Sequence, residues 1–413
     1  MALTAKGVWR EIKRRNHLHY FPLRRSLKGY DRETAAKDLR AGTNVALLAF
    51  PQGMAYAAIA GLPIQYGIYA SAIAAILGPI LSGSRFVILG PTNATSVLVF
   101  ASFLSLGVTT MEEKVSLISL VVFLSGLFLV LGAFLKIANL IQYISRSVVT
   151  GYITAAAIYI IVNQLKKVFG YDFSLPEGST FLTVIWLTIK NFPLTHIPTL
   201  VLSVMTLGLY LTLNQYYRKL PNVAITLVLM SAMAVLLERF IPPEIYGQGI
   251  ATLTAVDATR WHFTIPTLDG DLVSQLASVS LVIAFLSVLE GTSIGKSLAS
   301  RAGKRLNSNQ EMLGMGLANI GCAFYQGMPA SGSLTRSQLN WSSGGTTAMA
   351  SMVSGLLCAL GAYTLGPLTR FIPVSVLGVL VISIGLSLIN RHVLRIVWNA
   401  TGSDRQPGGL QHC

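Results

Sequence analysis

The stretch that decides the fold is Phe86-Val87-Ile88-Leu89-Gly90-Pro91-Thr92-Asn93-Ala94-Thr95-Ser96. Its aromatic and β-branched first half favours an extended backbone, and Gly90-Pro91 ends any helix that approaches from the N-terminal side. Thr92 and Asn93 are suitable helix N-caps. The stretch therefore predicts an extended segment followed at once by the start of a helix.

A second stretch has the same design: Phe324-Tyr325-Gln326-Gly327-Met328-Pro329-Ala330-Ser331-Gly332-Ser333-Leu334-Thr335-Arg336-Ser337. Non-helical backbone at membrane depth survives only where it is buried in protein or lines a cavity. Each helix start also leaves backbone N–H groups free and carries a partial positive charge, which suits an anion. The alternative is a pair of ordinary proline kinks packed through small residues. Two such stretches in matching positions favour a functional interpretation.

The composition indicates a membrane protein. Hydrophobic residues make up 53% of the 413 positions and charged residues only 11%, whereas about a quarter of a soluble domain is charged. No Asp, Glu, Lys or Arg occurs between Arg40 and Arg85, and further long apolar stretches follow. Each is close to the roughly 20 residues that a helix needs to cross the hydrocarbon. We therefore expect an all-α, multi-pass integral membrane protein.

About twelve spans are predicted from these lengths, near residues 39–59, 64–82, 91–107, 115–135, 145–165, 197–214, 221–239, 272–297, 309–325, 333–343, 346–366 and 372–390. Counted from a cytosolic N-terminus, this order places most basic clusters in the cytosol, with Lys166/Lys167 as an exception. Both termini are therefore predicted to be cytosolic, and the sequence does not indicate which membrane holds the protein. Segment 179–192 is apolar but short, so we interpret it as an interfacial helix.

The chain divides into four predicted parts: a basic N-terminal tail (1–37), a first repeat (38–240, spans 1–7), a second and incomplete repeat (271–390, spans 8–12) and a polar tail (391–413). The two broken helices are the third span of each repeat and enter from opposite sides, which is typical of an inverted repeat with a midplane site. The net charge of +15 is ascribed to loops that fix the orientation, not to nucleic-acid binding. No catalytic triad, metal cluster or phosphate loop stands out, so we expect no enzyme activity, cofactor or metal.

Arg336 is the sharpest single indication of function. It lies beside the second helix start, with no acidic residue within twenty positions along the chain. Ionisable residues within spans are costly and mark substrate or ion pathways. A guanidinium beside two positive helix ends therefore predicts an anion site. The alternatives are an arginine that extends to the surface or one paired with a distant carboxylate.

Two further groups are candidates. Glu290 lies among small residues in its span, where desolvation favours the neutral carboxyl, so it is a candidate for proton coupling. It is also a candidate to neutralise Arg336 when the site is empty, or to form a structural ion pair. In the first span, Gln52 and Tyr56 share one helical face and can donate hydrogen bonds to an oxyanion, although such pairs also join helices.

Several motifs together resemble the sulfate permease family of anion transporters. In chain order they are Pro51-Gln52-Gly53-Met54-Ala55-Tyr56-Ala57, Ala60-Gly61-Leu62-Pro63, Tyr66-Gly67-Ile68-Tyr69-Ala70-Ser71, Gly90-Pro91-Thr92, Ile144-Ser145-Arg146-Ser147-Val148-Val149-Thr150-Gly151-Tyr152, Leu289-Glu290-Gly291-Thr292-Ser293-Ile294-Gly295-Lys296 and the run 329–340.

The resemblance implies a seven-plus-seven inverted-repeat fold, in which a core domain carries substrate past a gate domain. It implies an anion between the third and tenth helix starts, contacted by the first span. The matching positions are Gln52, Tyr56, Asn93, Ala94, Ser333, Thr335 and Arg336. Glu290 matches an acidic position associated with proton coupling. Sulfate, bicarbonate, chloride and oxalate are the implied substrates, with a proton as the coupling ion.

The chain also departs from the family pattern, which has fourteen spans and usually a cytosolic STAS domain. The apolar pattern ends at Asn390, so we expect the last two spans and the STAS domain to be missing, as in a truncated product. The leading hypothesis is sulfate–proton symport. A bicarbonate or chloride exchanger, an anion channel of the same fold and a homodimeric assembly stay open, while Arg336 disfavours a nucleobase–cation symporter.

Overall fold

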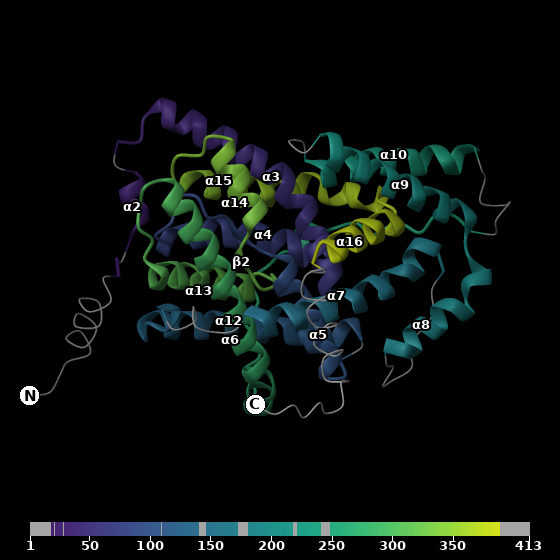
Figure 1. Ribbon diagram of the computed structural model, residues 1–413, viewed down its shortest axis with the longest axis horizontal. Coiled ribbons are helices and arrows are strands. Elements are labelled where there is room, and N and C mark those ends of the chain that lie inside the picture. Colours follow the sequence, from purple (N-terminus) through teal and green to yellow (C-terminus); the bar gives the residue numbers. More distant parts are fainter. Residues whose placement is uncertain are drawn as a thin grey trace, which may run out of the picture.

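The computed structural model describes residues 18–388, apart from 20, 28, 109, 140–145, 172–180, 218–220 and 241–247. The predicted polar tail, residues 391–413, and most of the basic N-terminal tail lie outside the described residues. The part of the chain that is described is almost wholly helical, as Figure 1 shows. The fold class predicted from the sequence is confirmed.

The same order of elements occurs twice. The first run is α3 (Arg32–Ala60), α4 (Ile64–Leu81), β1 (Leu89–Gly90), α5 (Asn93–Ser105) and α6 (Met111–Phe134). The second run is α12 (Gly270–Arg301), α13 (Ser308–Phe324), β2 (Ser331–Gly332), α14 (Leu334–Ser342) and α15 (Met349–Thr364). In each run a short strand replaces the start of the third helix, as the two glycine- and proline-containing stretches predict.

The remaining helices are α2 (Leu23–Ser26), α7 (Arg146–Phe169), α8 (Phe181–Lys190), α9 (Ile197–Tyr216), α10 (Asn222–Phe240) and α16 (Val374–Leu388). Short 3-10 turns are η1 (Ile137–Asn139), η3 (Phe192–Leu194), η4 (Ala258–Arg260) and η5 (Gly366–Phe371). The short segment predicted near 179–192 is indeed a helix, α8. Its large side chains Leu182, Trp186 and Ile189 are exposed, and Lys190 Nζ lies 4.8 Å from the centre of the Trp186 ring.

One boundary differs from the prediction. The first long helix was expected from residue 39, but α3 begins at Arg32. Asp31 caps it, because the carboxylate accepts a hydrogen bond of 2.8 Å from the Thr34 backbone N–H. The acidic cap also complements the positive end of the helix. The predicted span begins where the hydrophobic stretch begins, and the first turns of α3 before that point are polar.

The helices meet the requirements of a membrane span. Among the described residues, five helices are long and apolar enough to cross a membrane, namely α4, α6, α9, α10 and α12, and α5, α15 and α16 are shorter apolar helices. Large apolar side chains point outward along α9 and α10, where Val204 and Val228 are 64% and 69% exposed. Contact of such surfaces with lipid tails costs no free energy, whereas their exposure to water is unfavourable. The protein is therefore an integral, multi-pass membrane protein.

The helices form two groups that lie side by side in Figure 1. The strand-pair group contains α3–α6 and α12–α15, which pack mainly on one another. The α16 group contains α7, α9, α10 and α16. Most contacts between the groups come from α3 and α5, which touch α7, α10 and α16. The two short strands lie within the strand-pair group.

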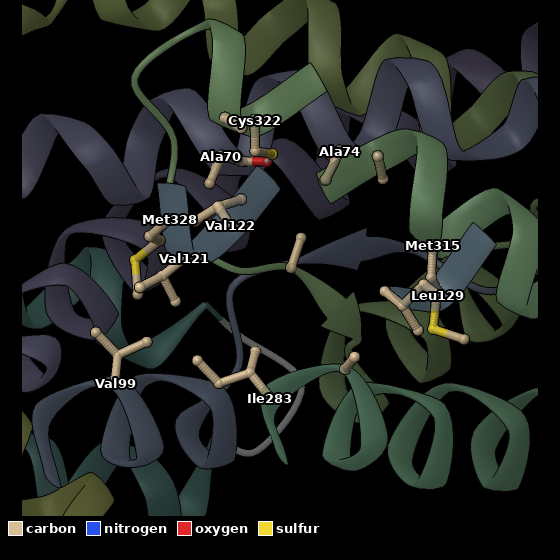
Figure 2. Close-up of a cluster of buried hydrophobic side chains, with 14 of the residues drawn as sticks. Ala70, Ala74, Val99, Val121, Val122, Leu129, Ile283, Met315, Cys322 and Met328 are labelled. Carbon is tan, nitrogen blue, oxygen red and sulfur yellow. Dashed lines mark hydrogen bonds between the residues drawn. The ribbon is translucent and has the colours of Figure 1, made fainter. Parts of the chain in front are cut away.

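Helix α13 is the centre of the strand-pair group. Its side chains are buried along almost the whole length, although it carries polar residues such as Glu311 and Asn319. Met315 and Cys322 of α13 pack in the apolar cluster drawn in Figure 2, together with Leu129 of α6 and Ile283 of α12. A helix surrounded by protein on all sides is a rigid support for the segments that contact it.

Close crossings of small residues hold this group together. At the crossing of α3 and α4, a Cβ added to Gly67 would lie 1.8 Å from the Gly53 carbonyl oxygen. No side chain fits in that space, so the two backbones touch directly. Helices inside a membrane associate through such small-residue contacts, because lipid gives them no hydrophobic driving force.

We predict that Gly67→Ala forces α3 and α4 apart and destabilises the protein by about 1–3 kcal/mol or more. Gly208→Ala is the matched control, because nothing lies within 4 Å of a Cβ at that position in α9. The control is expected to be neutral or slightly stabilising, because alanine is the better helix former. Thermal unfolding in detergent measures both. Equal melting temperatures for the two variants would contradict the close crossing.

Candidate anion site

The first helix start is fixed by its own cap. Thr92 precedes α5 in an extended conformation, and its hydroxyl accepts a hydrogen bond of 3.4 Å from the Thr95 backbone N–H. Thr95 returns the contact, since its hydroxyl accepts from the Thr92 N–H at 3.2 Å. This reciprocal pair is a capping box, which ends the strand and starts the helix at one residue. The N-terminal end of α5 is thereby held beside β1.

The second helix start is held by the first stretch. Ser333 caps α14, and its backbone N–H donates to the Ile88 carbonyl at 3.0 Å. The Ile88 N–H in turn donates to the Ser337 hydroxyl at 2.9 Å. Between these contacts, β1 and β2 pair antiparallel, with Leu89 opposite Gly332 and Gly90 opposite Ser331. Because the strands are antiparallel, α5 and α14 leave the pair in opposite directions, and both positive helix ends face it.

Arg336 lies in the first turn of α14 and is fully buried. Its Nε donates to the Gln52 side-chain oxygen at 3.3 Å, and its Cζ lies 5.8 Å from the centre of the Tyr56 ring. A Cβ added to Gly90 would lie 2.1 Å from Arg336 Nη1, so the guanidinium rests against the backbone of β1. The structure thus brings together Arg336, Gln52 and Tyr56, which the sequence placed in one site.

The two terminal nitrogens of this guanidinium, Nη1 and Nη2, have no hydrogen-bond partner among the described residues. Arginine stays charged in proteins, and a buried charge is costly unless it is paired and hydrogen-bonded. Its planar donors match the paired oxygens of an oxyanion. Of the two alternatives weighed for Arg336, exposure at the surface is wrong, and no carboxylate within the described ranges forms an ion pair with it. The two unpaired donors make Arg336 a candidate anion-binding residue.

Glu290 lies at the other side of the strand pair. It is half-buried, and its carboxylate accepts a hydrogen bond of 2.8 Å from the Thr92 hydroxyl, the cap of α5. The next residue, Gly291, packs on β2, because a Cβ at Gly332 would lie 2.7 Å from the Gly291 Cα. Glu290 and Arg336 form no ion pair, so the structure does not favour the interpretation of Glu290 as its neutralising partner.

The remaining predicted residues lie around the strand pair. Asn93 is half-buried and Ala94 is buried, both in the first turn of α5, at the opposite end of the pair from α14. Ser333 is buried and its hydroxyl accepts a 3.5 Å contact from the Arg336 backbone N–H. Thr335 is exposed, with its hydroxyl 3.4 Å from that of Ser333. The predicted set thus surrounds the pair, with Gln52 and Tyr56 against the guanidinium.

Sequence reasoning missed the residues that support the two strands. Asn340 donates to the Phe86 carbonyl at 3.1 Å, and Asn319 and Glu311 of α13 hydrogen-bond the segments that lead into β2 and β1. Asn319 and Glu311 are polar residues inside a buried helix, and this was the available signal for them. Within the described ranges, no group of three or more His, Cys, Asp or Glu side chains is placed to hold a metal ion.

The sequence profile described as "Sulfate permease family" matches residues 36–405, which is nearly the whole chain. The chain belongs to the sulfate permease family. The motifs that suggested this resemblance include the two helix starts and the first span, and the structure brings these segments together around Arg336.

Among curated relatives, the chain is 27% identical over 367 residues to "Sulfate transporter 4.1, chloroplastic" of Arabidopsis thaliana, covering 89% of this chain and 53% of that protein. It is 29% identical over 401 residues to the "Sodium-independent sulfate anion transporter" of Bos taurus, covering 90% and 64%. The chain therefore spans between half and two thirds of the length of these relatives. Both relatives are named as transporters and not as enzymes.

Solved structures show the same fold. The transmembrane domain of a cyanobacterium bicarbonate transporter, BicA, superposes with a TM-score of 0.75 at 20% identity, covering 89% of this chain and 91% of that domain. The murine Solute Carrier 26 family member A9 in its inward-facing state gives a TM-score of 0.79 at 20% identity, covering 97% and 66%. The arrangement of helices around the strand pair is thus a known membrane-transporter fold.

We predict that Gly90→Ala moves the guanidinium without unfolding the protein. The new methyl group would overlap Arg336 Nη1, which is the far end of a long side chain and can shift, while the β1 backbone stays in place. Anion binding is expected to weaken about tenfold, as a shift of roughly 1.4 kcal/mol would produce. Calorimetric titration with sulfate measures it, and Gly208→Ala is again the control. Unchanged affinity in folded Gly90→Ala protein would place the anion away from this nitrogen.

Proposed function

We propose that this protein is a secondary active transporter of a small inorganic oxyanion, with sulfate as substrate and a proton as coupling ion. The anion binds between the N-terminal ends of α5 and α14, against Arg336. The proposal rests on one observation above all, the two unpaired guanidinium nitrogens of a fully buried arginine. An anion that enters supplies the missing partners and relieves the cost of the buried charge.

The choice of sulfate follows from the geometry and from the relatives. Sulfate offers tetrahedral oxygens to donors on several sides, here the guanidinium, the Tyr56 hydroxyl and the free N–H groups of two helix starts. The two curated relatives described above carry sulfate in their names. Bicarbonate, chloride and oxalate are smaller or flatter and meet fewer of these donors at once. They are the competitors against which sulfate is measured.

Alternating access follows from the two groups of helices. The anion site belongs to the strand-pair group, and the α16 group packs on it mainly through α3 and α5. At this boundary the rings of Phe100 in α5 and Tyr159 in α7 lie 5.5 Å apart. We infer that the strand-pair group moves as one body against the α16 group and carries the site from one side of the membrane to the other.

The proposed orientation, with both termini in the cytosol, rests on the distribution of basic residues along the sequence.

Proton coupling is assigned to Glu290. Its carboxylate accepts a hydrogen bond from the Thr92 hydroxyl at the cap of α5, and so lies beside one of the two helix starts. A negative carboxylate at this place repels an anion, and a protonated one does not. Proton uptake therefore favours anion binding. Sulfate uptake is expected to rise as the external pH falls.

We predict that Arg336→Ala weakens sulfate binding about a hundredfold or more, because two charge-assisted hydrogen bonds are lost. Arg260→Ala is the matched control, since this arginine is exposed and paired with Asp257. Binding of radiolabelled sulfate to purified protein measures both, with bicarbonate, chloride and oxalate as competitors. Melting curves verify that both variants are folded. If folded Arg336→Ala binds sulfate as the parent does, the site is elsewhere.

We predict that Glu290→Gln keeps sulfate binding and loses its dependence on pH. Glutamine preserves the acceptor oxygen for Thr92 and stays neutral at every pH. The measurement is sulfate uptake into proteoliposomes at a series of external pH values. An inward proton gradient drives uphill uptake in the parent and does not in the variant. A parent protein with equal uptake at all pH values would rule out the proton as coupling ion, and passive flux alone would indicate a channel.

A further inference from the structure

One helix supports both extended segments of the anion site. Asn319, in the middle of α13, is fully buried. Its side-chain nitrogen donates to the Ala330 carbonyl at 2.8 Å, and its oxygen accepts from the Ala330 N–H at 2.9 Å. Ala330 is the residue immediately before β2. Both backbone polar groups of this residue are thus satisfied by one side chain, which fixes where β2 begins.

The same helix fixes the approach to β1. Glu311, in the first turns of α13, is buried and accepts a hydrogen bond of 2.7 Å from the Ser84 backbone N–H. Both of its carboxylate oxygens also accept from the Ser82 hydroxyl, one of them at 2.8 Å. Ser82 and Ser84 form the turn between α4 and β1. Among the described residues, no basic side chain pairs with this carboxylate.

Hydrogen bonds and the covalent links between neighbouring residues connect these contacts to Arg336. The Ser84 hydroxyl accepts from the Val87 N–H at 3.2 Å, and the Ile88 N–H donates to the Ser337 hydroxyl at 2.9 Å. Ser337 directly follows Arg336. Gly90, two residues past Ile88, carries the backbone against which the guanidinium rests. The position of β1 therefore sets the position of the guanidinium.

Helix α13 is itself held firmly. It crosses α6 at Gly316 and Gly126, where a Cβ on Gly126 would lie 3.0 Å from the Gly316 carbonyl oxygen. Most of its residues are buried against neighbouring helices, which restricts its movement. A rigid helix of this kind fixes the position of the segments that are hydrogen-bonded to it, because a close-packed interior has low compressibility.

We propose that Asn319 and Glu311 are positioning residues for the anion site. They touch no anion, and they set the alignment of β2 and β1 and hence the direction of the Arg336 donors. This inference rests on the proposed function, since it assumes that the alignment of β1 and β2 positions Arg336 to bind an anion. It assigns to α13 the role of a common base for both broken helices. A purely structural role, in which the two residues only stabilise the fold, is the alternative to be tested.

The first test compares Asn319→Leu with Ser125→Ala. Leucine has nearly the size of asparagine but makes neither hydrogen bond to Ala330. Ser125 is a matched control, because it is fully buried and donates to the Ser280 carbonyl at 3.0 Å, joining α6 to α12 away from the strands. Both variants are expected to lower the melting temperature. Only Asn319→Leu is expected to weaken sulfate binding, by about tenfold.

The second test uses rescue at Glu311. Glu311→Gln retains an oxygen that accepts from the Ser84 N–H, whereas Glu311→Leu retains none. The positioning role predicts sulfate affinity close to the parent for the glutamine variant and about tenfold weaker affinity for the leucine variant. Loss of affinity in both variants to the same extent would show that the charge of Glu311 matters and not its contact with Ser84, and would overturn the assignment.

Hydrogen exchange separates this inference from the proposed function. Exchange of the backbone amides of residues 86–90 and 330–334 reports the strand pair directly, whether or not an anion binds. Asn319→Leu is expected to raise exchange in both segments, and Ser125→Ala in neither. If the parent binds no sulfate but this pattern appears, the proposed function fails and the positioning of the strands stands. If the parent binds sulfate and Asn319→Leu binds it equally well, the positioning role is wrong.

Discussion

The structure depends on a constraint that lipid imposes on the peptide backbone. Every N–H and C=O group inside the bilayer must find a partner within the protein, so a helix can be interrupted only where another segment supplies the missing bonds. Here the two interrupted helices supply them to each other, through the antiparallel pairing of Leu89–Gly90 with Ser331–Gly332. The same pairing points two positive helix ends at one buried location. The pairing that completes the backbone hydrogen bonds thus also forms the proposed anion site.

The buried charge of Arg336 also needs a partner within the protein or from a ligand. A buried guanidinium with unpaired donors destabilises the protein without an anion. An anion that pairs with these donors removes that cost, and this difference in free energy favours binding in the proposed site. The surrounding contacts prevent relaxation. Gln52 holds Nε and Gly90 leaves room for Nη1. The strand-pair group carries all of these residues, whereas the α16 group carries none of them. That separation suits a carrier whose site travels with one body.

Much of this could be read from the sequence, and the reasons are local. Gly90-Pro91 and the run around Pro329 each lie between an extended segment and residues that cap a helix, and Arg336 stands out because charges are rare in apolar stretches. What could not be read depends on contacts between distant residues. Asn319 lies eleven positions before Ala330, and Glu311 lies more than two hundred positions after Ser84. Nothing in the local pattern shows which backbone a buried Asn or Glu will bond.

The start of α3 and the exposure of Thr335 also depend on contacts that the sequence pattern does not show. The sequence placed the helix start by hydrophobicity, which marks the edge of the membrane, whereas the Asp31 cap marks the end of the helix. Family motifs placed Thr335 in the site, yet its side chain is exposed. Position along a motif gives the segment, and only the packing around the segment gives the direction of each side chain.

A crystal structure with selenate tests the central claim most directly. Selenate has the shape and charge of sulfate, and the anomalous scattering of selenium locates it without reference to the protein. The account predicts a selenium peak between the starts of α5 and α14, with oxygens in hydrogen-bonding distance of Arg336 Nη1 and Nη2. A peak at another place, with these two nitrogens still unpaired, would contradict it.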